Sequence, residues 1–229
     1  MCGRMTITLT QEMAAAILAG IRIPEWRAPR YNVAPTQSVP ALLNEDPATV
    51  AWLRWDLRAA GSGAPLINAR AETLAEKPTF REAYARRRCL VIADGFYEWP
   101  QLGGRRATGP YYFQLRDEPL MMFAGLWGRG PGPSGEPVLA CAIVTTAAND
   151  LLRPLHDRMP VIIPPAQRNR WLDPRAVAPG QVDDLFAPYP AVAMTARPVS
   201  ARVNRVHHDD PACLEAPRPD PQASLPGFS

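Results

Sequence analysis

The first chemically distinctive feature is the pair Met1-Cys2 at the start of the chain. Aminopeptidases remove an initiator methionine when the next residue is small, so we expect a mature chain that begins with Cys2. That residue would carry an α-amine titrating near pH ~8 and a thiol titrating near pH ~8.5. A 1,2-aminothiol condenses with an aldehyde to a five-membered thiazolidine ring. The competing interpretation is that Cys2 is an incidental residue of a disordered terminus.

Two further polar residues have neighbours that suggest chemistry. Asn68 lies in LINARAET, with Arg70 two positions further on. An amide there can hold a polar intermediate and an arginine can bind phosphate, although an asparagine before a helix can also be a simple cap. Glu98 lies among aromatic residues in DGFYEWP. Partial burial would suit its carboxyl group to proton transfer, and the alternative is an exposed strand residue.

The histidines divide into one candidate acid/base group and one pair. His156, in LRPLHDRMPVII, precedes an apolar run and has Asp157 beside it, so it could transfer protons near neutral pH or be a polar loop residue. His207 and His208 precede two aspartates, and without further spaced ligands we interpret that cluster as a polar turn. The four cysteines include no C-x-x-C pair, so we predict no zinc site. Nothing indicates another metal or an organic cofactor.

The elements that must position these residues are mostly strands. Apolar or alternating runs predict strands at residues 38–43, 49–55, 88–99, 110–116, 120–127, 137–148, 159–164 and 191–200. Thr8 and Gln11 have capping-box spacing for a helix that follows a short first strand, and Gly103-Gly104 marks a hairpin. Further short helices are expected at 71–77, 79–88, 168–171 and 182–186.

No regular strand–helix alternation is visible, so we predict one α+β domain over residues 2–216. Its core should be strand-rich, mostly antiparallel and barrel-like, with short flanking helices. Residues 217–229 should form a disordered Pro-rich tail.

The composition is that of an ordinary globular chain. Of 229 residues, 47% are hydrophobic, and the net charge of +3 would not by itself suggest nucleic acid. Lys77 is the only lysine, and the arginine excess is explained more simply by codon composition. There is no apolar leader or membrane-length apolar run, so we expect a cytoplasmic protein with reduced thiols. Cys89 and Cys141 should be buried in apolar runs, and Cys213 should be a bystander.

Several segments occur in a specific order: MCGR, RYNVAPTQ, INARAET, ADGFYEW, TTAAN followed by LHDRMPVII, and VSARVN. Together they resemble the SRAP (SOS-response-associated peptidase) family over about residues 2 to 216. The resemblance implies a mixed α/β domain with a β-rich core and a role in DNA damage and repair. It implies that the protein shields abasic sites in single-stranded DNA through a thiazolidine crosslink from the N-terminal cysteine to the ring-opened sugar aldehyde.

The resemblance also implies residue roles. Cys2 would be the nucleophile and Asn68 would orient the crosslinked sugar. Glu98 would act on the α-amine and assist ring opening or imine formation. His156 would stabilise or protonate the sugar oxygen. The chain would act as a monomer and associate with the nucleoid when bound to DNA.

DNA contacts are expected from Arg4, Arg70, Trp99 and Arg158. One departure affects this expectation. The family usually has a Trp-Gly-x-x-Pro segment after the second strand, whereas this chain has Asp56 after Trp55 and lacks the proline. An extra acid near a phosphate path would weaken binding, and Arg54 and Arg58 could offset it.

Two other functions use the same residues. One is an N-terminal-cysteine peptidase that acts on itself or on other proteins, which requires an oxyanion hole. The other is a non-covalent single-stranded DNA binder that relies on arginines and on stacking by Trp99.

Overall fold

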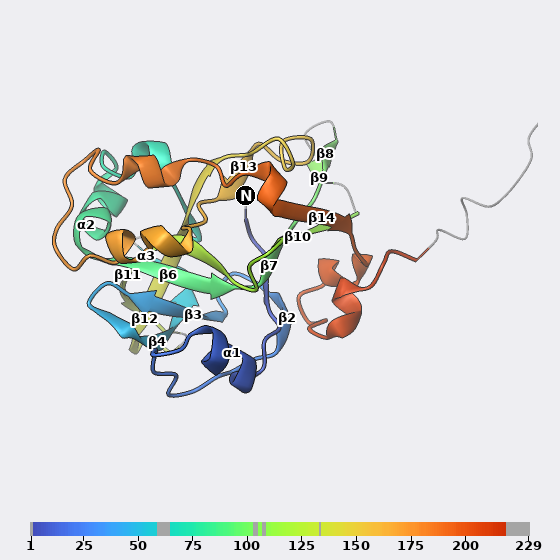
Figure 1. The fold of residues 1–229 in the computed structure, drawn as a ribbon, viewed down its shortest axis with the longest axis horizontal. Helices are drawn as coiled ribbons and strands as arrows, with labels where there is room; N and C mark the ends of the chain where they lie inside the picture. Colours follow the sequence, from blue (N-terminus) through green and yellow to red (C-terminus); the bar gives the residue numbers. More distant parts are fainter. Residues whose placement is uncertain (1, 59–64, 103–104, 107–108, 133, 219–229) are drawn as a thin grey trace, which may run out of the picture.

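Five strands form a closed barrel in the computed structural model, which describes residues 2–58, 65–102, 105–106, 109–132 and 134–218. The strands are β3 (Ser38–Leu43), β4 (Asp46–Trp55), β6 (Arg88–Ala93), β11 (Met121–Pro131) and β12 (Pro137–Ala147). Their order is β11-β6-β3-β4-β12, and the pairing of β12 with β11 closes the ring (Figure 1). All pairs are antiparallel except β4 with β12.

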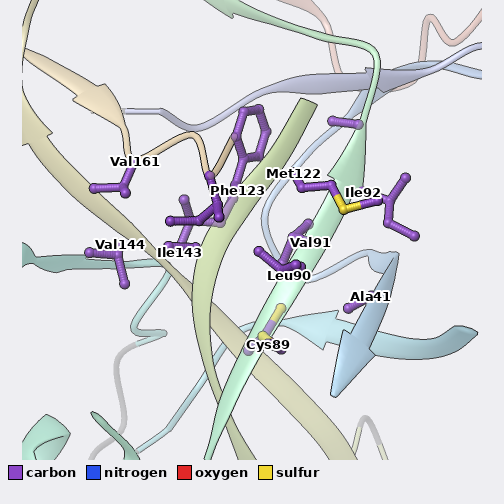
Figure 2. Close-up of a cluster of buried hydrophobic side chains, with 14 of the residues drawn as sticks. Ala41, Cys89, Leu90, Val91, Ile92, Met122, Phe123, Ile143, Val144 and Val161 are labelled. Atoms are coloured by element: carbon purple, nitrogen blue, oxygen red, sulfur yellow. The ribbon is translucent and has the colours of Figure 1, made fainter. Parts of the chain in front are cut away.

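The barrel is filled by the apolar runs that the sequence shows. Every residue of β6 is buried, as expected of a strand covered on both faces. Side chains from β6, β11 and β12 pack together there, including Val91, Phe123 and Ile143 (Figure 2). Gly125 permits this packing, because a Cβ there would lie 2.7 Å from the Cys89 sulfur.

A second, wholly antiparallel sheet carries the amino terminus. It consists of β1 (Met5–Ile7), β2 (Arg30–Val33), β7 (Gly95–Glu98), β10 (Tyr111–Leu115) and β14 (Met194–Pro198), in the order β14-β10-β7-β1-β2. Only Asp94 separates β6 of the barrel from β7 of this sheet. Its carboxylate accepts hydrogen bonds from the side chain of Thr6 and from the main chain and side chain of Thr8. Asp94 therefore fixes β1 at the junction of the two sheets.

Two short strands extend the far half of β12. β5 (Asn68–Arg70) pairs with it in parallel, and β13 (Arg158–Pro160) pairs with it in antiparallel orientation. A separate ribbon joins β8 (Gln101–Leu102) to β9 (Arg105–Arg106). β5 and β13 therefore bring the chain around Asn68 and around His156 to the same end of one barrel strand.

The described helices are short. The α-helices are α1 (Gln11–Ile17), α2 (Pro78–Arg86) and α3 (Arg168–Trp171). The 3₁₀ segments are η1 (Ala71–Thr73), η2 (Pro165–Gln167), η3 (Asp183–Phe186), η4 (Ala191–Ala193), η5 (Ala201–Asn204) and η6 (Pro211–Leu214). Among the described helices, none is long and apolar enough to cross a membrane.

The predicted fold class is confirmed, while several local predictions are wrong. Thr10 caps α1, because Thr8 is occupied by Asp94. The helix expected at 71–77 shortens to η1, and Pro78 opens α2 from its first position, where a missing N–H costs nothing. Of the strand expected at 159–164, only Met159 and Pro160 belong to a regular strand, β13 (Arg158–Pro160).

Two remaining predictions concern the ends of the fold. Cys213 is not a bystander: it is fully buried in a small cluster with Tyr97, Trp99 and Val203. The Gly103-Gly104 hairpin and the tail from residue 219 onward lie outside the described residues, and the 2–216 boundary stays a prediction.

Candidate active site

Cys2 lies three residues before the start of β1 and is fully buried. Its main-chain carbonyl accepts a 2.8 Å hydrogen bond from Asn68 Nδ2. Burial raises the pKa of the Cys2 thiol far above its ordinary value, and the negative charge of Glu98 raises it further. The sulfur is therefore a neutral thiol near pH 7, placed beside a carboxylate.

Glu98 ends β7 and is 3% exposed. Its position follows from the sheet, because Glu98 pairs with Tyr111 on β10 while β7 pairs with β1 on its other side. The expectation that Glu98 is buried is confirmed, and the exposed-strand alternative is wrong. The carboxylate and the thiol are brought together by neighbouring strands that are far apart in sequence.

Asn68 is the first residue of β5 and lies opposite Ile143 of β12. The preceding Ile67 carbonyl accepts hydrogen bonds from Trp55 Nε1 at 2.8 Å and from the Ile143 main chain at 3.0 Å, which fixes the register. Asn68 Oδ1 is buried and accepts no hydrogen bond from the residues that the structure describes. Asn68 is not a helix cap, since Arg70 occupies that position before η1. Its amide instead faces Cys2.

His156 is 7% exposed and precedes β13. Its Nδ1 accepts a 2.9 Å hydrogen bond from the main-chain N–H of Arg158. Burial lowers the pKa of His156, and the positive charge of the amino terminus lowers it further. The ring is therefore neutral at pH 7 with its proton on Nε2, where it can be donated. Asp157, 3.0 Å from Nδ1, would stabilise the protonated ring.

The four predicted catalytic residues thus converge on the amino terminus. The Cys2 carbonyl accepts a hydrogen bond from Asn68, and burial together with the charge of Glu98 raises the pKa of the Cys2 thiol. The positive charge of the amino terminus at residue 1 acts to lower the pKa of both Cys2 and His156. Among the described residues no group of three His, Cys, Asp or Glu side chains could hold a metal ion. The site therefore offers a thiol, an amide, a carboxylate and a neutral imidazole.

Comparison with known sequences identifies the family. The family described as SOS response associated peptidase (SRAP) matches residues 1–206. This chain belongs to the SRAP family. It is 36% identical over 224 residues to the abasic site processing protein YoqW of Bacillus subtilis, covering 94% of this chain and 100% of that protein. It is 28% identical to the abasic site processing protein HMCES of Mus musculus, covering 93% of this chain and 75% of that one.

Solved structures agree with the SRAP fold. A protein from Bacteroides thetaiotaomicron superimposes with a TM-score of 0.79 at 24% identity, covering 94% of this chain and 99% of the other. A phage-related protein from Bordetella bronchiseptica gives a TM-score of 0.65 at 32% identity, covering 86% and 94%. The barrel with its second sheet is therefore a shared architecture.

Two of the predicted DNA contacts of this SRAP chain lie inside the protein. Arg4 is 6% exposed and donates to Asn32 Oδ1 at 2.5 Å and to the Val203 carbonyl at 2.6 Å. Its guanidinium lies 5.7 Å from the ring centre of Trp99. Trp99 is also 6% exposed, and its Nε1 donates to Asn204 Oδ1 at 2.6 Å. Both side chains are buried within the protein, and their contact with DNA stays a prediction.

The other two predicted contacts lie near the surface. Arg70 is exposed at the end of β5. Arg158 binds both carboxylate oxygens of Glu72, at 2.5 and 2.9 Å, and donates to the Thr145 carbonyl at 2.6 Å. The hydrogen bonds from Arg158 lower the pKa of Glu72. Glu72 is a member of this site that sequence reasoning missed, although it lies two residues beyond Arg70.

Asn32 is the second missed residue. It is fully buried in RYNVAPTQ, and its Oδ1 accepts from Arg4. Its Nδ2 donates to the main-chain carbonyls of Val203, Arg205 and His208 at 2.6–3.2 Å. The segment belongs to the SRAP pattern, but no sequence signal indicates that this amide joins β2 to the C-terminal region.

Asp56, the departure from the family pattern, has a fully buried side chain. Its Oδ2 lies 3.3 Å from Arg54 Nε and 2.9 Å from Arg58. Two guanidinium groups therefore share one buried carboxylate, and the effect of Asp56 on DNA binding stays a prediction.

Proposed function

We propose that this chain processes abasic sites in single-stranded DNA by forming a covalent thiazolidine link through Cys2 after Met1 is removed. The observation that carries the proposal is the burial of Cys2 between Asn68 and Glu98. Chain ends are usually exposed and loosely held. Here, in contrast, the second residue of the chain is fully buried beside polar side chains.

The reaction has two bond-forming steps. The α-amine of Cys2 adds to the aldehyde carbon of the ring-opened sugar, and loss of one water gives an imine. The thiol then adds to the imine carbon, and its proton passes to the nitrogen, which closes the five-membered ring. One water is released overall and no oxidant or reductant is needed.

Each neighbouring side chain has a role in these steps. The Glu98 carboxylate accepts the proton that the α-ammonium must lose before it attacks. The neutral His156 ring donates its Nε2 proton to the sugar oxygen. Asn68 holds the Cys2 carbonyl through Nδ2 and offers its buried Oδ1 to a sugar hydroxyl or to the amine. Arg70 and Arg158 would contact flanking phosphates.

Incubation with single-stranded DNA that contains one abasic site, followed by a denaturing gel, tests the proposal. We expect a shifted band that survives denaturation and disappears in Cys2→Ala and Cys2→Ser. An uncleavable extension before Cys2 should also abolish it, because the free amine is lost. If wild type binds the DNA under native conditions but gives no band after denaturation, the covalent proposal is wrong and the chain is a non-covalent DNA binder.

As the second half of the proposal, we assign the removal of Met1 to the same site. The family description includes a peptidase. Cys2, the residue that follows Met1, is buried, accepts a hydrogen bond from Asn68 and has its thiol pKa raised by burial and by the charge of Glu98. Measuring the intact mass of the purified protein distinguishes self-cleavage from removal of Met1 by a host aminopeptidase. If Glu98→Ala retains Met1 while wild type has lost it, the site acts on its own chain. If both have lost Met1, the host enzyme is responsible.

A further inference from the structure

A cavity that Cys2 does not line has the chemistry of an anion site. It has a volume of about 250 Å³ and is lined by Leu57, Arg58, Pro78, Thr79, Ala83, Arg87, Gly128 and Arg129. Three of these side chains are guanidinium groups and one is a hydroxyl. No carboxylate among the described residues lines the cavity.

The first turn of α2 forms one wall. Pro78 opens this nine-residue helix, and no side chain caps it. The first N–H groups of a helix have no partner within it and carry a partial positive charge. Because Pro78 has no N–H, that of Thr79 is the first available, and Thr79 lines the cavity.

The three arginines retain a net positive charge. Arg58 shares the single carboxylate of Asp56 with Arg54. Arg87 pairs with Glu82 where both side chains are exposed, which neutralises little in water. Arg129 is exposed, and within the described part of the chain its guanidinium makes no hydrogen bond or ion pair.

Gly128 keeps the cavity open between two of its walls. A Cβ at this position would lie 3.1 Å from Leu57 Cδ1 and 3.9 Å from Arg87 Nε. Arg87 is held in place by a 3.2 Å hydrogen bond from its Nε to the Trp127 carbonyl. The space between the guanidinium groups is therefore bounded by a fixed arginine and a residue without a side chain.

We propose that this cavity binds a phosphate group, supplied by the backbone of single-stranded DNA that flanks the nucleotide at Cys2. Arginine donors match phosphate oxygens in a planar, bidentate manner, and a helix amino terminus adds main-chain donors. The choice of DNA as the source rests on the proposed function. Gly128 pairs with Ala140 of β12, and Asn68 pairs with Ile143 of the same strand. Because these two positions of β12 are three residues apart, the cavity and Asn68 are offset by roughly 10 Å in the direction of the strand.

The test compares Arg129→Gln and the double variant Arg58→Gln/Arg129→Gln with the control Arg81→Gln. Arg81 is exposed on α2 but does not line the cavity, so the control removes one charge from the same helix. Binding of a short oligothymidylate without an abasic site is measured by fluorescence anisotropy across salt concentrations. The slope of log K against log salt should become shallower by up to roughly 0.7, the contribution of one bound phosphate. The double variant should show the larger change, and the control should show none.

A second arm uses inorganic pyrophosphate and isothermal calorimetry. Wild type and Arg81→Gln should bind it, and the double variant should not. Loss of pyrophosphate binding with unchanged DNA slopes would overturn DNA as the source and leave a site for free phosphate. Unchanged behaviour of both lining variants in both arms would overturn the site. If the slopes fall as expected while wild type forms no covalent band, the proposed function fails and this site stands.

Discussion

Burial keeps the thiol of Cys2 protonated near pH 7, and this decides the order of the proposed steps. Desolvation and the charge of Glu98 both raise its pKa, so little thiolate is present to attack first. The α-amine is the nucleophile that can be activated, by transfer of its proton to Glu98. The thiol then closes the ring on an imine that is already in place.

Replacing Glu98 should therefore slow adduct formation while leaving the nucleophile intact. We expect Glu98→Gln to reduce the single-turnover rate of the covalent band by roughly 10²-fold, the lower end of what a positioned acid–base group contributes. Glu76→Gln, at an exposed position, is the matched control. A normal rate in Glu98→Gln would show that the carboxylate has another role, even with Cys2 correctly assigned.

The neutral state of His156 makes a prediction about stability and pH. The folded pKa lies below the unfolded value of about 6.5, so as the pH falls through 6.5 the unfolded chain binds a proton that the folded chain does not. The free energy of unfolding of wild type should therefore decrease relative to His156→Gln, by at most about 1.4 kcal/mol per pH unit.

Urea denaturation at a series of pH values between 7 and about 5 measures this difference, the lower end lying below the unfolded histidine pKa. His207→Gln, which replaces an exposed imidazole, is the matched control. Parallel curves for wild type and His156→Gln would mean that the ring takes up a proton equally well in both states.

At the scale of elements, β12 is the strand that assembles the site. Its far half pairs with β5 on one side and β13 on the other, so Asn68 and His156 are fixed by one barrel strand. Glu72 and Arg158 connect the segments that follow β5 and begin β13. This ion pair also supports His156, since the N–H of Arg158 fixes its tautomer.

Removing the charge of Glu72 should strengthen DNA binding. Glu72→Gln leaves the guanidinium of Arg158 with its bond to Thr145 and removes a negative charge beside Arg70. We expect tighter binding of single-stranded DNA at low salt and a smaller gain at high salt, because screening reduces surface electrostatics. The free energy of unfolding should fall by no more than about 1 kcal/mol, as for other surface ion pairs. Weaker binding at low salt would contradict this account.

The regular elements were predictable from the sequence where one pattern dominates. The apolar run of β6 and the alternation of β4 indicated strands, because burial on two faces or one leaves that pattern. The cap of α1 was not predictable, because Thr8 is claimed by Asp94, a contact across 86 positions. Arg88 is a second contact that the sequence did not indicate. It is fully buried within an apolar strand, and among the described residues its guanidinium donates to main-chain carbonyls, including those of Trp171 and Tyr84.

The site residues were predictable as types but not as a geometry. Cys2, Glu98 and His156 were singled out from their own chemistry and from the order of the motifs. Their convergence depends on two sheets meeting at Asp94, which no local pattern encodes. The inward position of Arg4 and Trp99 was also invisible, since an arginine and a tryptophan near a nucleophile suit a DNA surface and a packed support equally well.

At the scale of the whole molecule, the C-terminal region closes over the sheet that carries Cys2. Asp209 accepts hydrogen bonds from the main-chain N–H groups of Tyr31 and Asn32 on β2, and pairs with Arg30. Val203 and Cys213 are fully buried against Tyr97 and Trp99. The last described segment is therefore part of the fold, although the family match ends at residue 206.

A chain ending at residue 218 should be as stable and as reactive as the full chain, whereas one ending at residue 198 should not. The shorter chain loses Val203, whose carbonyl binds Arg4, and Asn204, which binds Trp99. Loss of Val203 and Val199 alone removes about 3–6 kcal/mol of apolar burial.

Urea denaturation and the covalent-band assay measure stability and reactivity in the same preparations. Should the shorter chain fail to fold, Asp209→Ala offers a milder break. It removes the hydrogen bonds of Asp209 to β2 and keeps every buried apolar residue, while the hydrogen bonds of Asn32 to the C-terminal region remain. We expect this variant to lower stability and slow adduct formation together, since β2 supports β1 and β1 positions Cys2. Full reactivity in a destabilised Asp209→Ala chain would show that Cys2 is held by Asn68 and Glu98 without help from the closing segment.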